Sequence, residues 1–290
     1  MNHAMPVPNA ATPPTRDSSI GGLLLESGKI TPENAERVLR MQRELGIRFG
    51  EAAQRLGLIT EADIQQVLAR QFDYPYLQAN EGKFSAELVA AYQPFSPQVE
   101  TLRAIRSQLM LRWFATGRKS LAVISINPDD GAALFVANLA IVFSQLGEQT
   151  LLVDANLRAP RQHELFDLKG RQGLSDMLAG RAELDAIAKI DSFVDLSVLS
   201  AGTLPPNPQE LLNRPAFGAL NGRLESRYDA VLYDMPALAL GSDGLAIAAR
   251  AGGALLIARK NKTLLADLNT VSRQLSSTGV KVVGSVLVDF

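Results

Sequence analysis

The chain has 290 residues, which is enough for one large domain and a small one. Its formal net charge of −1 gives no overall attraction to nucleic acid or to an anionic membrane surface, so no nucleic-acid partner is expected. The sequence contains no cysteine, which excludes disulfides and thiol catalysis, and two histidines are too few for a histidine-rich metal site.

The sequence gives no sign of a targeting or membrane segment. Residues 1–16 are rich in proline and alanine and lack the apolar core of a signal peptide. The apolar run at 136–143 is too short to cross a bilayer, and the run at 245–258 contains Arg250. These features predict a soluble, cytoplasmic protein.

Changes in composition predict four segments. Residues 1–18 contain four prolines and are expected to be disordered. Residues 19–80 form a predicted small helical domain, 81–98 a linker, and 99–290 a larger domain. In the larger domain, apolar strands alternate with amphipathic helices, which is typical of an α/β protein with a parallel sheet. The clearest strands are expected at 121–125, 150–154, 196–199, 230–234, 254–258 and 282–287, and helices at 132–146, 209–226 and 264–276.

The small domain contains an internal repeat. Gly21 is followed 29 residues later by Gly50, and Gln42 by Gln71. Each unit has the pattern of a helix, a glycine stop and a second helix. Threonines at 31 and 60 stand where the N-caps of the second helices belong.

This repeat resembles the N-terminal domain of type II secretion and pilus ATPases, the MshEN-like domain, which in part of that family binds cyclic di-GMP. The resemblance implies Arg48, Gly50 and Gln71 as candidate cyclic di-GMP contacts, because arginine suits a phosphate or a guanine edge. The first copy has Ser19 and Ile20 before its glycine, so its arginine is missing. The alternative is a helical docking domain whose apolar positions form only its core.

The segment 121–135 stands where a phosphate-binding loop would follow the first strand and open a helix. After Ser125, the expected Gly-x-Gly-Lys-Ser/Thr pattern is replaced by Asp129, Asp130, Gly131, Ala132 and Ala133. Unit charges about 4 Å apart interact by roughly 4 kcal/mol at an effective dielectric of 20, whereas a helix dipole contributes about 0.3–1 kcal/mol. The added aspartate and the lost lysine therefore predict poor phosphate binding.

Four other segments follow a family pattern. They are Asp154-Ala-Asn-Leu-Arg-Ala-Pro160, Val231-Leu-Tyr-Asp-Met-Pro236, Gly202-Thr-Leu-Pro-Pro-Asn-Pro208 and Glu100-x-x-Arg103-x-x-Arg106. In order and spacing they resemble the bacterial tyrosine autokinases (BY-kinases) of capsule and exopolysaccharide export across residues 99–290. With its small domain in front, the chain is similar to the exopolysaccharide-linked subgroup often named EpsG, whose members are chain-length determinant tyrosine kinases.

The resemblance implies a P-loop NTPase-like, mostly parallel sheet with helices on both faces, and ATP with Mg²⁺ as cofactors. It implies catalytic roles for Asp154, Arg158 and Asp234, with Asp154 acting on a tyrosine hydroxyl and near Mg²⁺ and Asp234 holding Mg²⁺ through water. Their position at strand ends fits the ligand edge of parallel sheets. The family's second acidic residue is Asn156 here, which lowers the expected metal affinity. A structural alternative for Asp154 is a carboxylate that caps the next turn.

The resemblance also implies partners. Glu100, Arg103 and Arg106 match a helix that assembles family members into rings, although three residues spaced in this way could also be a solvated face. Expected partners are copies of this chain, an active kinase paralogue, and the cytoplasmic tail of a membrane chain-length regulator that recruits the protein to the inner membrane. The C-terminal tyrosine cluster of the family is absent, because the tyrosines stand at 74, 76, 92, 228 and 233.

Three hypotheses remain open from the sequence. The first is a catalytically impaired scaffold of the exopolysaccharide machinery. The second is an ATP-dependent tyrosine kinase with an unorthodox loop. The third is a cyclic di-GMP sensor built on residues 19–71. Cell-division and partition ATPases are a weaker match, because they lack the Pro-Pro-Asn-Pro segment and the N-terminal repeat.

Overall fold

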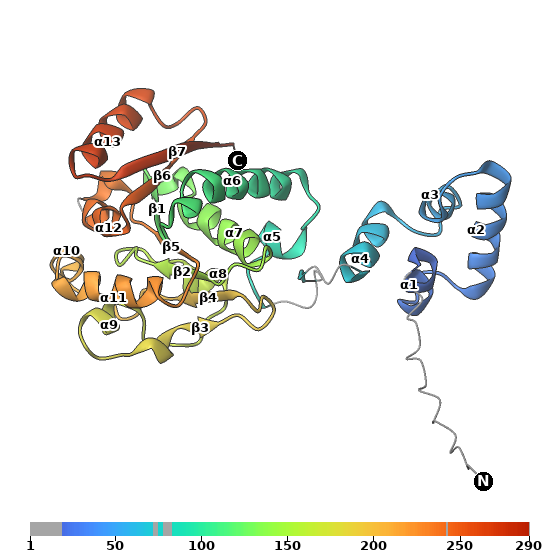
Figure 1. Cartoon of the computed structure of the whole chain (residues 1–290), viewed down its shortest axis with the longest axis horizontal. Coiled ribbons are helices and arrows are strands. Elements are labelled where there is room, and N and C mark those ends of the chain that lie inside the picture. The colour runs from blue at the N-terminus through green and yellow to red at the C-terminus, as the bar shows by residue number, and fades with distance from the viewer. Residues whose placement is uncertain (1–18, 72–74, 78–82, 242, 290) are drawn as a thin grey trace, which may run out of the picture. The chain divides into compact units, whose positions relative to one another are not determined.

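The computed structural model describes residues 19–71, 75–77, 83–241 and 243–289. The predicted tail at 1–18 lies outside the described residues. Contacts divide the chain into two units, with the boundary between residues 74 and 75, and each unit is described by itself (Figure 1). Within the described residues, no helix combines the length and the apolar character needed to span a bilayer.

The described part of the N-terminal unit, residues 19–71, consists of four helices, and the two repeats have the same local geometry. Its helices are α1 (Ile20–Glu26), α2 (Pro32–Leu45), α3 (Phe49–Arg55) and α4 (Glu61–Gln71). Gly28 and Gly57 follow α1 and α3 with φ of 67° and 66°, a conformation that glycine adopts without the steric cost of a Cβ atom. The Thr31 hydroxyl accepts a hydrogen bond from the Asn34 amide, which caps α2.

The four helices enclose a small core of their own. Its members are mainly aliphatic and come from both repeats: Leu24, Ile30, Ala35, Val38, Ala52, Ala53, Ile59 and Val67. Thr60 and Asp63 form reciprocal hydrogen bonds at the start of α4, the arrangement of a capping box. Local capping and the shared core explain why the 29-residue period produces paired helices.

The C-terminal unit is built on a seven-stranded sheet. Its strands are β1 (Ser120–Ser125), β2 (Thr150–Asp154), β3 (Ala188–Lys189), β4 (Leu196–Leu199), β5 (Ala230–Asp234), β6 (Gly253–Arg259) and β7 (Lys281–Val288). Their order is β3-β4-β2-β5-β1-β6-β7. All neighbours are parallel except β3 and β4.

Two helical layers cover the sheet (Figure 1). One layer packs with the first core cluster and contains α5 (Val89–Tyr92), α6 (Pro97–Arg112), α7 (Ala132–Ser144) and α8 (Gln162–Leu165). The other contains α9 (Leu174–Leu178), α10 (Pro208–Leu212), α11 (Pro215–Glu225), α12 (Asp243–Ala251) and α13 (Leu265–Ser277). Short 3-10 turns lie at η1 (Phe114–Thr116), η2 (Pro128–Asp130), η3 (Leu184–Ala186) and η4 (Leu238–Leu240). Helices on both faces of a mostly parallel sheet confirm the predicted fold class.

Two features of this unit were not predicted from the sequence. The short strand β3 pairs antiparallel with β4 over only two residues, so it has no periodic pattern to detect. The predicted helix at 209–226 is two helices, because Pro215 starts α11 and Arg214 before it is extended.

The described part of the predicted linker at 81–98 is packed on the sheet unit. Leu88, Ala90 and Ala91 are fully buried in its core. The Ala90 amide donates to Asn138 Oδ1 on α7 at 2.8 Å. The Ser85 amide donates to the Leu165 carbonyl at 2.9 Å. These long-range contacts make the segment part of the domain, which its proline-containing sequence did not indicate.

Candidate functional site

Three predicted site residues end neighbouring strands at one edge of the sheet. Ser125 ends β1, Asp154 ends β2 and Asp234 ends β5. Asp154 and Asp234 are direct partners in the register between β2 and β5, and both are buried. The structure thus brings together residues that are 80 positions apart in sequence. This is the edge where open parallel sheets bind ligands.

Asp154 is held by backbone amides. Its Oδ1 accepts from the Asn156 amide at 3.2 Å, and its Oδ2 accepts from the amides of Arg161 and Gln162 at 3.1 and 3.0 Å. Burial disfavours the charged form and raises the pKa of Asp154 to about 7, although these three hydrogen bonds oppose the shift. The structural alternative, a carboxylate that caps the next turn, therefore accounts for part of the contacts of Asp154.

Asp234 lies against a glutamine that the sequence analysis did not select. Gln162 Nε2 donates to Asp234 Oδ2 at 2.6 Å and to the Ala133 carbonyl at 3.0 Å. Burial, followed by the charge of Asp154, raises the pKa of Asp234. Asp234 Oδ1 and Gln162 Oε1 are buried without a hydrogen-bond partner. The only sequence signal for Gln162 was its place two residues after the segment 154–160.

The loop between β1 and α7 is stabilised from within. Asp130 is buried, and its Oδ2 accepts from the Asn127 amide at 2.9 Å. Gly131 has φ of 78° and leads into α7. The Asp129 side chain is on the exposed part of this turn, while its carbonyl accepts from Arg259 Nη1 at 2.9 Å. The Asp130 carboxylate therefore stabilises the turn that leads into α7.

A small pocket opens beside this loop, with a volume of about 250 Å³. Its walls include the predicted loop residues Ser125, Gly131, Ala132 and Ala133, together with Asp234. The pocket is smaller than the roughly 300–1,000 Å³ typical of small-molecule sites. No group of three or more histidine, aspartate or glutamate side chains suited to a metal ion occurs in the part of the chain that the structure describes.

Arg158 is paired away from the two aspartates. Its Nε donates to Asp243 Oδ2 at 2.6 Å, and Asp243 is almost fully buried. The pair connects the loop after β2 to the start of α12, so Arg158 contacts Asp243 and not the predicted catalytic carboxylates. Asp243 was missed because nothing in its local sequence indicates a partner 85 residues away.

Comparison with solved structures identifies the family. The kinase domain of the Escherichia coli tyrosine kinase Etk is 30% identical, with a TM-score of 0.68, and the match covers 74% of this chain and 84% of that one. The chain belongs to the bacterial tyrosine kinase family. The chimeric protein CapA2B2 is 31% identical with a TM-score of 0.65, and the match covers 79% of this chain and 98% of that one.

Curated sequences agree with this membership. The tyrosine-protein kinase Wzc of Salmonella typhimurium is 32% identical over 202 residues, which are 70% of this chain. The match covers 28% of Wzc, so the BY-kinase chain spans between a quarter and a third of the length of such relatives. No family model matches the sequence.

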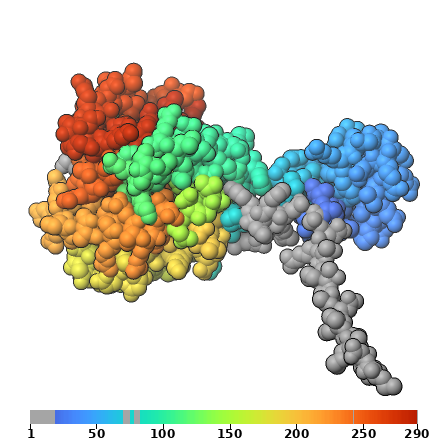
Figure 2. All heavy atoms as spheres, in the orientation of Figure 1, coloured from blue at the N-terminus to red at the C-terminus, as the bar shows by residue number. Residues whose placement is uncertain are grey.

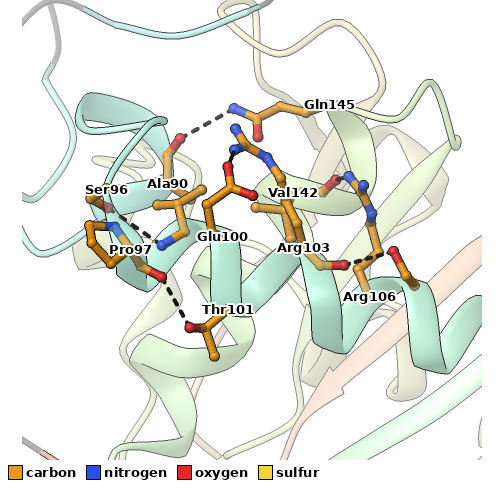
Figure 3. A network of polar contacts seen from close by, with 11 residues as sticks. Ala90, Ser96, Pro97, Glu100, Thr101, Arg103, Arg106, Val142 and Gln145 are labelled. Carbon is orange, nitrogen blue, oxygen red and sulfur yellow. Dashed lines mark hydrogen bonds and ion pairs between the residues drawn. The ribbon is translucent and has the colours of Figure 1, made fainter. Parts of the chain in front are cut away.

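The predicted assembly residues of this BY-kinase lie on α6 and contact their own chain (Figure 3). Arg103 forms an ion pair with Glu100 three residues earlier. Arg106 Nη1 donates to the Val142 carbonyl near the end of α7 at 2.5 Å. Glu100 is the more exposed member of the ion pair, with 62% of its side chain exposed against 18% for Arg103. Of these three residues, Arg106 attaches α6 to α7 within the chain.

The cyclic di-GMP candidates lie in the N-terminal unit. Arg48 is exposed at the N-cap of α3 and makes no capping bond with its side chain. Gly50 is buried, and a Cβ atom there would lie 3.1 Å from Ile64 Cδ1. Close packing against Ile64 therefore favours a glycine at position 50 independently of any ligand. The side chain of Gln71 lies outside the described residues.

Proposed function

We propose that this chain is a BY-kinase-like component of exopolysaccharide or capsule biosynthesis, in chain-length control, which acts as a scaffold and does not transfer phosphate. The family membership and the four motifs at 100–106, 154–160, 202–208 and 231–236 support the biosynthetic role. The small N-terminal unit supports a place in the EpsG-like subgroup.

The position of Gln162 carries the scaffold part of this proposal. In the family, the residue matching Asp234 holds Mg²⁺ through water. Here Gln162 Nε2 donates to that carboxyl and to the Ala133 carbonyl. A neutral amide thus occupies the side of Asp234 that faces the start of α7. The pocket wall carries alanines at 132 and 133 in place of a lysine and a hydroxyl. These residues do not fit Mg·ATP.

Calorimetric titration of the purified chain with Mg·ATP and Mg·ADP tests the proposal. We expect dissociation constants weaker than roughly 1 mM, which corresponds to about 4 kcal/mol. The matched control is the triple variant Asp129→Gly, Ala132→Lys and Ala133→Thr, which restores a family-like loop and should bind more tightly. A micromolar constant for the unchanged chain would instead support the alternative, a kinase that uses Asp154, Arg158 and Asp234.

The scaffold proposal includes partners. Candidates are copies of this chain, an active kinase paralogue, and the cytoplasmic tail of a membrane chain-length regulator, which would recruit the protein to the inner membrane. Light scattering with and without such a tail tests this association. A Glu100→Lys variant should weaken it, because Glu100 is the exposed member of the α6 ion pair, whereas Glu210→Lys on α10 should not. A chain that stays monomeric and ignores the tail would contradict the proposal.

The second candidate function is cyclic di-GMP sensing. The observation that favours it is the exposed Arg48 at the start of α3. If the chain binds cyclic di-GMP, the variant Arg48→Ala should abolish binding. Binding that survives this change would remove Arg48 from the candidate site.

A further inference from the structure

The two outer strands of the seven-stranded sheet are built differently. Strand β3 lies at one side and pairs over only two residues, so it presents little free backbone. Strand β7 lies at the other side and has eight residues, Lys281–Val288 (Figure 1). Proteins usually protect an outer strand by making it short, by placing a proline or a charge within it, or by covering it with a helix. Short length protects β3 but not β7.

The sequence of β7 does not protect its free side either. The strand reads Lys-Val-Val-Gly-Ser-Val-Leu-Val, with its one charge at the first position and no proline. On its inner side, β7 pairs with β6 along its whole length. On its outer side, no strand follows among the residues that the structure describes. The outward N–H and C=O groups of β7 can therefore pair with another strand.

The neighbouring helices leave side chains of β7 exposed as well. On one face of the sheet, α6 and β7 line an open groove of about 820 Å³, and Val283 and Val286 in its wall are only half-buried. The next residue, Leu287, points to the opposite face and is 67% exposed. Free backbone and exposed apolar side chains thus occur along the same strand. This combination suits another β-strand, which can use both.

The charges at the two ends of β7 favour a second copy of the chain as the source of that strand. Lys281 begins the strand, Asp289 follows its last residue, and every residue between them is uncharged. If two β7 strands pair antiparallel about a twofold axis, Lys281 of each copy lies beside Asp289 of the other. Parallel pairing would instead bring like charges together, which is destabilising. Asp289 contacts Lys260 through Oδ2 at 2.6 Å, and a carboxylate can accept on its other oxygen too.

We propose that two copies of this chain associate through β7, whose antiparallel pairing continues the sheet across a twofold axis near Ser285. Ser285 is small and exposed, so the two strands can approach each other there. The contact is the same on both copies and therefore closes as a dimer. The inference rests on the proposed function, in which copies of this chain are partners, and it assigns them a surface separate from Glu100 on α6.

Sedimentation velocity of the full chain over a range of concentrations tests the dimer. Lys281→Asp and Asp289→Lys should each raise its dissociation constant at least about tenfold, because each reversal replaces two attractive contacts by two repulsive ones. An equimolar mixture of these two variants should dimerise again, since each changed charge then faces its opposite. Lys189→Asp, at an exposed lysine of β3, is the matched control and should leave the dimer unchanged. A chain that stays monomeric, or a dimer that tolerates both reversals, would overturn the proposal.

Hydrogen exchange locates the contact and separates two kinds of failure. Amides of residues 281–288 should exchange more slowly when the dimer is populated than in the dilute monomer, whereas amides of β3 should not change. A dimer that is lost in Glu100→Lys but kept in Lys281→Asp would overturn this inference and leave the scaffold proposal intact. So would a chain that is monomeric alone yet binds the regulator tail. Micromolar binding of Mg·ATP would defeat the scaffold function without affecting the β7 contact.

Discussion

The buried carboxyl pair makes stability depend on pH. An aspartate in the unfolded chain ionises near pH 3.8, whereas Asp154 in the folded chain keeps its proton until about pH 7 and the pKa of Asp234 is raised too. Between these values the folded state binds more protons than the unfolded state. The free energy of unfolding contributed by the pair is therefore fully present below about pH 4 and is lost as the pH rises toward 7.

Asp234→Asn tests this dependence. The variant cannot ionise at this position, so its stability relative to the unchanged chain should increase as the pH rises from about 4 to 8. The slope should be at most about 1.4 kcal/mol per pH unit for one proton. Urea unfolding at several pH values measures it. Asp185→Asn, at an exposed aspartate, is the control and should show no such trend. A pH-independent difference for Asp234→Asn would contradict the burial argument.

Gly202 shows why one family segment needs a glycine. Its φ is 79°, and a Cβ atom there would lie 2.4 Å from Asp176 Oδ2 and 2.6 Å from the Gly173 amide nitrogen. Asp176 also accepts from the Thr203 amide at 2.9 Å, so the contact cannot open without loss of this bond. The Pro-Pro-Asn-Pro segment is therefore attached to α9 through a close backbone approach.

Gly202→Ala should lower the free energy of unfolding by about 2 kcal/mol or more, through strain and the lost Asp176 bonds. Gly180→Ala is the matched control: its φ is 72°, but no atom lies within 4 Å of the place that the added methyl group would take. Chemical denaturation of both variants separates backbone strain from the steric clash. Equal losses would show that the Asp176 contact adds nothing.

At the scale of elements, α6 is attached to α7 by a charged hydrogen bond. Arg106 Nη1 donates to the Val142 carbonyl, and Gln145 Nε2 at the end of α7 donates to the Ala90 carbonyl (Figure 3). A cation near a helix C-terminus also interacts favourably with the helix dipole. Reversing the charge of Arg106 would therefore disturb the fold as well as any assembly.

Arg106→Ala should lower stability by about 1.5–3 kcal/mol, the range for a hydrogen bond from a charged group. Arg112→Ala, at an exposed position on the same helix, should change it by less than about 0.5 kcal/mol. Thermal unfolding compares the two. On its other face, α6 lines an open groove together with β7, and the two lie side by side in the space-filling view (Figure 2). A larger loss of stability in Arg112→Ala than in Arg106→Ala would show that α6 is held mainly through that face.

At the scale of the whole molecule, the contacts place the domain boundary after residue 74 and not after 98. Phe84 packs edge-on against Phe166 with ring centroids 5.7 Å apart, and Leu88 is fully buried. The segment before α6 therefore covers apolar surface that the sheet unit would otherwise expose to water.

Two shortened chains test this boundary. A chain that starts at Pro75 should unfold with the stability of the sheet unit in the full chain. A chain that starts at Val99 should lose at least about 2–3 kcal/mol, because Asn138 loses the Ala90 amide and the core is uncovered. Urea unfolding followed by Trp113 fluorescence reports on the sheet unit alone, since Trp113 is the single tryptophan and is buried. Equal stability of both shortened chains would show that residues 75–98 act as a linker and add nothing to the stability of the sheet unit.

The sequence by itself determined the α/β class, six of the seven strands to within about a residue or two at each end, and the paired helices of the N-terminal unit. These features depend on local patterns: continuous apolar runs in strands buried on both faces, and glycines at helix ends. The sequence also placed Ser125, Asp154 and Asp234 at one edge, because parallel strands that precede helices bring their carboxyl ends together.

The tertiary structure alone decided what those side chains contact. Gln162 against Asp234, Asp243 against Arg158, and Ala90 against Asn138 join positions 48 to 85 residues apart. No local period encodes such pairs, because they arise only when the sheet order brings β2, β5 and α7 together. The raised pKa values of the two aspartates have the same origin, since burial and a charged neighbour across the register exist only in the folded chain.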